Sequence, residues 1–177
     1  MNKNTKFIIF FLFFLFSIIF FYQKKYNIGS FIFSLGLIPI FFLFNNEFLL
    51  LAFIQIGKKN KKGLKKYLDY IKNPKLQLTN DQIACFYFLK GIYYSDKNIN
   101  KSEFYMQKSL DSGLKFKQNI AIAKYNMAIA SLSKGNKKNA EILLSEAKKM
   151  DVSGILKVQI ELTRKQMQKF NLKYYKK

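Results

Sequence analysis

An uncharged run of aromatic and aliphatic residues near the N-terminus restricts this chain more than any other feature. Residues 7–23 carry no charge, and nearly all of them are Phe, Ile or Leu. A helix of this length reaches about 25 Å, slightly less than the ~30 Å hydrocarbon core of a bilayer. No small-residue cleavage site follows the run, so we predict a retained membrane span over residues 7–23. The flanking lysines are expected to carry their ammonium groups to the lipid headgroups: Lys3, Lys6, Lys24 and Lys25.

A second apolar segment begins near Ile28 and contains Gly36 and Pro39. We predict a second span over residues 28–50, kinked at Pro39 because proline lacks a backbone donor. Glu47 lies near the end of this segment, where its carboxylate is expected to reach the headgroups. Two alternatives stay open for residues 48–57: they continue the span, or they form the first helix of the next domain at the membrane surface.

The composition of the chain changes sharply near Gly57. Fifteen of the twenty Phe residues precede Lys58, whereas eighteen of the net twenty-one positive charges lie at or after it. Six lysines occupy residues 58–66, and only two lie in the loop between the spans. Because lysine-rich segments stay on the cytoplasmic side, we predict an integral protein of a bacterial cytoplasmic membrane with both termini in the cytoplasm. Its membrane anchor would be residues 1–57 and its cytoplasmic domain residues 58–177.

The residue types on which most enzymes depend are scarce. The chain has no His and one Cys, Cys85, and its ten acidic residues are scattered. The lack of imidazole removes the usual proton shuttle near neutral pH and the commonest metal ligand, and a single thiol allows no intrachain disulfide. We predict no catalytic, cofactor-binding or metal site and no small-molecule substrate. Cys85 is expected to pack as a small apolar residue.

Lysine supplies thirty of the thirty-one basic residues. Nucleic-acid surfaces normally use Arg as well, because its guanidinium pairs bidentately with phosphate and bases. Specific nucleic-acid binding is therefore not expected. Two interpretations of the lysines remain: they are solvated positions enriched by the base composition of the genome, or they form a surface that binds anionic lipid headgroups or RNA.

After Gly57 the apolar residues follow helical spacing, and we predict an all-α domain. An i, i+3, i+4, i+7 pattern that starts at Leu64 predicts a helix over residues 61–72, ended by Asn73-Pro74. Thr79 and Gln82 have the spacing of a capping box at the start of the next helix. Gly135 is expected to stop a later helix, and Ser153 to cap the last one.

Residues 121–151 carry the most specific pattern of the chain. They contain a Tyr-Asn-Met-Ala sequence at residues 125–128, followed by a turn glycine and then by small, large and small residues spaced along a second helix. This stretch resembles a tetratricopeptide repeat (TPR), although Val152 replaces its closing proline. The residues that carry the resemblance are Tyr125, Asn126, Met127, Ala128, Gly135, Ala140, Leu144 and Ala147. Small residues at Ala128 and Ala140 are what two closely packed antiparallel helices require.

A weaker copy of the pattern covers residues 84–113, with Asn98 in the place of the turn glycine. Its matching residues are Tyr87, Gly91, Tyr94, Ser102, Met106 and Ser109. A third, fragmentary copy ends at Pro74 and would take residues 48–57 as its first helix. Residues 153–177 have one apolar stripe, which fits a capping helix with a polar outer face that ends a solenoid. That stripe consists of Leu156, Ile160, Met167, Phe170 and Tyr174.

The TPR resemblance implies a short antiparallel helical solenoid whose first helices line a concave face. Members of the family commonly bind peptides or helices on this face. Carried over by position, the predicted partner groove holds Phe88, Ile92, Tyr125, Ile129 and Leu132. The alternative is that these residues pack against helices of the same chain. We expect a membrane-anchored scaffold that contacts membrane lipids and a protein partner.

Overall fold

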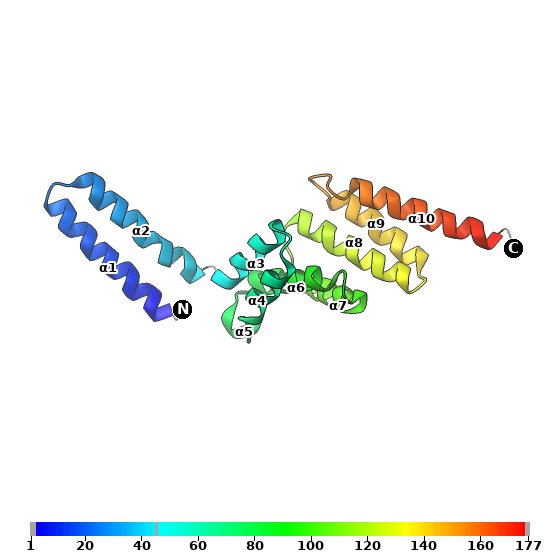
Figure 1. Cartoon of the computed structure of the whole chain (residues 1–177), viewed down its shortest axis with the longest axis horizontal. Helices are drawn as coiled ribbons and strands as arrows, with labels where there is room; N and C mark the ends of the chain where they lie inside the picture. The colour runs from blue at the N-terminus through cyan, green and yellow to red at the C-terminus, as the bar shows by residue number, and fades with distance from the viewer. Residues whose placement is uncertain (1–2, 45, 176–177) are drawn as a thin grey trace. The chain divides into compact units, whose positions relative to one another are not determined.

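Every regular element in the part of the chain that the structure describes is an α-helix (Figure 1). The computed structural model describes residues 3–44 and 46–175, and these hold ten helices and no strand. The all-α prediction is therefore confirmed. The chain divides into two compact units, residues 1–50 and residues 51–177, named here the hairpin unit and the helical unit.

The hairpin unit is built from α1 (Lys3–Tyr22) and α2 (Tyr26–Phe44), which pack side by side. Lys24 adopts the left-handed conformation between them, with φ 59°. The backbone N–H groups of Lys24 and Lys25 donate to carbonyls of the last turn of α1, both at 3.0 Å. This arrangement ends α1 and reverses the direction of the chain.

Small residues bring α1 and α2 close together. A Cβ atom at Gly36 would lie 2.9 Å from the Cβ of Phe13, so a larger residue there would push the helices apart. Ser17 is 1% exposed, and its hydroxyl donates to the carbonyl of Gly29 at 3.0 Å. Close approach and hydroxyl bonds of this kind hold helices together in lipid, where burial from water gives no drive.

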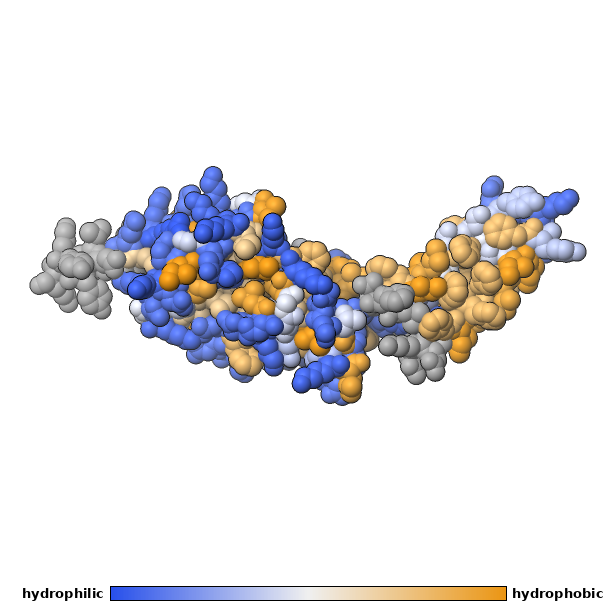
Figure 2. All heavy atoms as spheres, turned by 180° about the vertical axis from the view of Figure 1, so that it is seen from behind, coloured by the Kyte–Doolittle hydropathy of each residue, from blue (hydrophilic) through white to orange (hydrophobic). Residues whose placement is uncertain are grey.

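The outward surface of the hairpin is apolar, as the orange residues of Figure 2 show. Large side chains on both helices stand exposed, among them Phe7 at 59%, Phe11 at 58% and Phe31 at 66%. Soluble proteins rarely expose contiguous apolar patches of more than a few hundred Å². Among the described residues, α1 is the one helix that is long and apolar enough by itself to cross a membrane, over Thr5–Tyr22.

The second predicted span, residues 28–50, is not a single helix. α2 continues through Pro39 and ends at Phe44, and α3 (Glu47–Gly57) is a separate helix. Asn46 starts α3, because its side-chain oxygen accepts from the N–H groups of Phe48 at 3.0 Å and Leu49 at 3.2 Å. α2 and α3 meet the length and apolarity expected of a span only when they are taken together.

α4 (Lys61–Asp69) follows α3, with Leu64 and Leu68 buried on one face. The helix predicted over residues 61–72 is confirmed in position but ends three residues early. The short α5 (Pro74–Gln77) has its proline in the first turn. α6 (Asn80–Tyr94) then begins as predicted at Thr79, whose N–H donates to the Gln82 side chain at 3.2 Å, the reciprocal half of a capping box.

The next four helices pack as two pairs, α6 with α7 (Ile99–Asp111) and α8 (Lys117–Ser133) with α9 (Lys137–Met150). The hydroxyl of Ser102, early in α7, donates to the carbonyl of Gly91, late in α6, at 2.9 Å. Ser109, late in α7, donates to the carbonyl of Ala84, early in α6, at 2.8 Å. These two bonds show that α6 and α7 run in opposite directions.

The last helix starts later than predicted. α10 (Lys157–Tyr175) begins four residues after Ser153, so the prediction that Ser153 caps it is wrong. Gly154, with φ 69°, turns the chain before the helix, and the Asp151 carboxylate accepts from the Leu156 N–H at 2.9 Å. The Asp151 carboxylate, and not the Ser153 hydroxyl, therefore accepts a backbone N–H just before the start of α10. The side chains of Phe170 and Tyr174, predicted for the apolar stripe, lie outside the described side chains.

Candidate functional site

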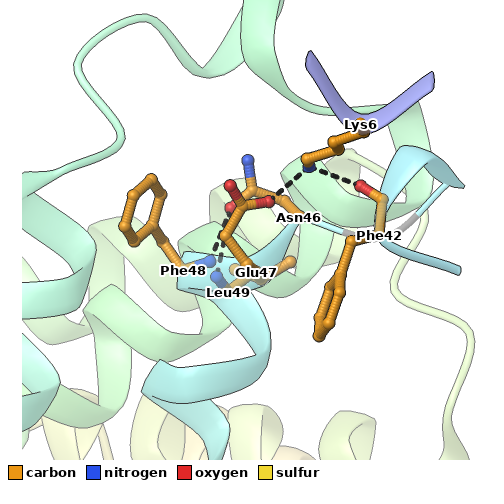
Figure 3. A network of polar contacts seen from close by, with 6 residues as sticks. All are labelled: Lys6, Phe42, Asn46, Glu47, Phe48 and Leu49. Carbon is orange, nitrogen blue, oxygen red and sulfur yellow. Dashed lines mark hydrogen bonds and ion pairs between the residues drawn. The ribbon is translucent and has the colours of Figure 1, made fainter. Parts of the chain in front are cut away.

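A polar cluster closes the end of the hairpin where α1 starts and α2 ends (Figure 3). The Lys6 ammonium donates to a carboxylate oxygen of Glu47 at 2.7 Å and to the carbonyl of Phe42 at 2.6 Å. The Lys6 side chain is 8% exposed and the Glu47 side chain 23%. One cation thus neutralises the first acid of α3 and satisfies a carbonyl at the C-terminal end of α2, where a positive charge is favourable.

The sequence did not predict this pairing. Lys6 and Glu47 were each expected to extend to lipid headgroups, but they bind one another. Their 41-residue separation hides this pairing in the sequence. The antiparallel return of α2 along α1 is what brings them together. The available signals were an isolated acid after a long apolar segment and Asn46 before it, the usual pattern of a helix start.

The α6–α7 pair shows why the weaker repeat copy contains small residues. Gly91 is buried, and a Cβ atom on it would lie 2.7 Å from the sulfur of Met106, which is 0% exposed. Ser102 and Ser109 are buried, and their hydroxyls donate hydrogen bonds to carbonyl oxygens of α6. Asn98, which stands in the place of the turn glycine, has φ −155°, and its side chain caps α7 by accepting from the Lys101 N–H at 2.9 Å.

The α8–α9 pair has the same construction with smaller side chains. Ala128, Ala140 and Ala147 are 0% exposed, as is Leu144 between the last two. Asn126 donates to the carbonyl of Ile122 in its own helix at 2.8 Å. Gly135, with φ 78°, ends α8 as predicted, since a side chain rarely adopts that conformation.

The five residues of the predicted groove occupy different environments. Phe88 is 2% exposed and lies in the core of the helical unit. Ile92, Ile129 and Leu132 are partly buried. Ile92 lines a shallow pocket of about 330 Å³ with residues of α3, α4 and the turn between them, including Leu64. The groove stays a prediction, and four of its five residues, these three and Tyr125, are partly buried.

Tyr125, the fifth groove residue, packs within the chain. Its ring lies against an apolar cluster shared by α8, α9 and α10, which includes Leu144 and Ile160. Its hydroxyl lies 3.4 Å from the Thr163 hydroxyl on α10. Replacing Tyr125 would therefore disturb the packing of α10 as well as any partner groove. A Tyr125 substitution thus cannot distinguish a role in partner binding from a role in internal packing.

A ladder of three tyrosine rings follows the α6–α7 pair. The rings of Tyr94 and Tyr105 stack with centroids 5.6 Å apart, and those of Tyr105 and Tyr87 with centroids 6.3 Å apart. Lysine ammonium groups lie over the same rings: Lys90 5.3 Å from Tyr105, Lys101 5.5 Å from Tyr94 and Lys108 4.6 Å from Tyr87. Such contacts stabilise a cation by the negative face of the ring.

The ladder gives part of the positive charge a structural role. Burial lowers the pKa of Lys90 below its ordinary value, the nearby charge of Lys108 lowers it further, and Asp69 opposes both. Nucleic-acid bases stack on free aromatic faces. Here the faces pack against one another and against ammonium groups, so the ladder is poorly suited to hold a base.

Cys85 is half-buried on α6. Burial raises the pKa of its thiol above the ordinary value, and the nearby Asp81 carboxylate raises it further. A reactive cysteine requires the opposite shift, because the thiolate is the nucleophile. In the residues that the structure describes, no group of three or more Cys, Asp or Glu side chains is arranged to hold a metal ion.

Comparison with protein-family models, with curated proteins and with solved structures finds no match to this chain. The geometry of its own residues is thus what bears on function. Two features stand out: a helical hairpin with an apolar exterior, and a unit of antiparallel helix pairs built on small residues. The first was predicted from hydropathy and the second from residue spacing.

Proposed function

We propose that this chain is a membrane-anchored adaptor, whose TPR-like helical unit faces the cytoplasm and holds a protein partner at the membrane. In this proposal α1 and α2 both cross the bilayer. α1 has 20 residues and α2 has 19, so each helix is about 30 Å long, the thickness of the hydrocarbon core. α2 meets the length and apolarity expected of a span only together with α3. The lysine-rich segment after α3 then lies on the cytoplasmic side.

The observation that carries the proposal is the construction of the two helix pairs. Gly91 and Ser102 in one pair, and Ala128 and Ala140 in the other, lie at the contacts that the TPR pattern assigns to small residues. Stacked helix pairs of this type present extended surfaces to other proteins. The sequence contains no His, the usual general acid or base of enzymes. A hairpin anchor joined to such a unit therefore suits binding of a partner better than catalysis.

Photo-crosslinking in native membranes tests the proposal. A photoreactive amino acid placed at Ile129, on the predicted groove, is expected to give one protein adduct of discrete mass. Ile142 on α9, which is 51% exposed, serves as the control position away from the groove. Leu162 on α10, which is 55% exposed, is a third labelled position. Adducts with lipid or RNA alone at Ile129, Ile142 and Leu162 would overturn the adaptor proposal in favour of a charged-surface binder. A protein adduct at Leu162 but none at Ile129 would preserve the adaptor and remove the groove.

A further inference from the structure

The last helix, α10, has apolar residues on its inner side and two exposed aliphatic residues on its outer side. On the inner side, Leu156 is 8% and Ile160 1% exposed, and both belong to the cluster shared with α8 and α9. On the outer side, Val158 is 63% and Leu162 55% exposed. These two lie one helical turn apart, so they form a short seam. The outer face predicted to be polar therefore also carries two exposed aliphatic side chains. Val158 and Leu162 are named here the α10 seam.

The seam stands on a firmly docked helix. Arg164, on α10, pairs with the Glu141 carboxylate at 2.6 Å and donates to the Ser145 hydroxyl at 2.9 Å, both on α9. The loop before α10 is fixed as well, because Gln118 bonds Asp151 at 2.8 Å and the Ser153 N–H at 3.0 Å. A rigid apolar seam loses little conformational freedom when a partner covers it.

The charged residues around the α10 seam favour an acidic protein partner over a second copy of this chain. Lys157 and Lys165 are exposed on α10, against one exposed acid, Glu161, and the sequence from Lys58 onward carries eighteen of the net positive charges. A second copy of the chain would bring two such charged units together. A partner with acidic residues beside its apolar positions would be attracted instead, since complementary charge promotes association.

We propose that the α10 seam binds an amphipathic helix of another protein, with acidic side chains flanking its apolar stripe. This inference rests on the adaptor proposal and adds the place and chemistry of the partner. Val158 and Leu162 would receive the aliphatic positions that such a helix repeats every three or four residues. Lys157 and Lys165 would face its carboxylates, and the partner would close the end of the stack formed by α8, α9 and α10.

Two synthetic helical peptides with the same leucine stripe, one flanked by Glu and one by Lys, provide the test. The full chain is placed in phosphatidylcholine discs, and peptide binding is followed by fluorescence anisotropy with empty discs as background. The Glu peptide is expected to bind the chain above background, and the Lys peptide at least about tenfold more weakly. The double variant V158Q/L162Q is expected to weaken the Glu peptide by about tenfold or more.

Ile142→Gln is the matched control, because Ile142 is an exposed aliphatic residue on the neighbouring helix. It is expected to leave binding of the Glu peptide unchanged. Equal loss in I142Q and V158Q/L162Q, no loss in the double variant, or no binding above empty discs would each overturn the seam proposal. So would a homodimer trapped by disulfide through Leu162→Cys in a Cys85→Ser background, which would assign the seam to a second copy. The adaptor proposal is tested separately, by photo-crosslinking at Ile129. A protein adduct at that position would still support the adaptor if the seam proposal failed.

Discussion

Leu144→Ala is expected to lower the free energy of unfolding of the helical unit by about 2–5 kcal/mol, the usual cost of a cavity in a packed core. Leu144 is 0% exposed and lies between Ala140 and Ala147 in the cluster that joins α8, α9 and α10. The tight packing of these small residues leaves little room for collapse around the lost side chain. Urea titration of the full chain in mild detergent, followed by far-ultraviolet circular dichroism, measures the change.

Ile142→Ala is the control for this prediction, two residues away on the same helix. Ile142 is 51% exposed, so its truncation is expected to change stability by no more than about 0.5 kcal/mol. Equal effects of the two substitutions would mean that α9 does not present Leu144 to the core. The assignment of its small residues to the α8–α9 contact would then be wrong.

Lys6→Met is expected to weaken the association of α1 and α2 by about 3–5 kcal/mol, the cost of removing one partner from a buried ion pair. The substitution leaves the Glu47 carboxylate without its ammonium and the Phe42 carbonyl without its donor. Pyrene labels on Thr5→Cys and Phe41→Cys, in a Cys85→Ser background, report the association through excimer emission. A titration with sodium dodecyl sulfate should then abolish excimer emission at a lower detergent fraction than in the parent.

The double variant Lys6→Met with Glu47→Leu tells the ion pair apart from general packing. Replacing both partners by apolar residues is often neutral, because the desolvation of the charges is also removed. The double variant is therefore expected to recover much of the loss. A double variant that is weaker than Lys6→Met alone would show that the pair itself is not what holds the open end of the hairpin.

Much of the fold follows from residue spacing, and the departures have local causes. The small residues Gly91, Ala128 and Ala140 are diagnostic because a close contact between two helices excludes large side chains. The spacing of such small residues can be recognised in the sequence alone. The sequence left open whether residues 48–57 continue the span or form a separate helix, because they are as apolar as those before them. The break between α2 and α3 is marked by Asn46, the cap of α3, and by Glu47 in the first turn of that helix.

Pairings over long separations escaped the sequence for a different reason. Lys6 and Glu47 meet because α2 returns along α1, and Arg164 meets Glu141 because α10 crosses onto α9. Neither pair has a short-range signature. The α10 seam was missed because the stripe of Leu156 and Ile160 already accounted for one face, and Val158 and Leu162 were not assigned to a second.

Accessibility of two single cysteines in intact cells tests the anchored, cytoplasm-facing arrangement most directly. In a Cys85→Ser background, Asn27→Cys lies in the first turn of α2, next to the loop from α1, and Lys137→Cys lies at the start of α9. A membrane-impermeant maleimide is expected to label residue 27 in intact cells and residue 137 only after lysis. Labelling of residue 137 in intact cells, or protection of residue 27 until lysis, would contradict the account.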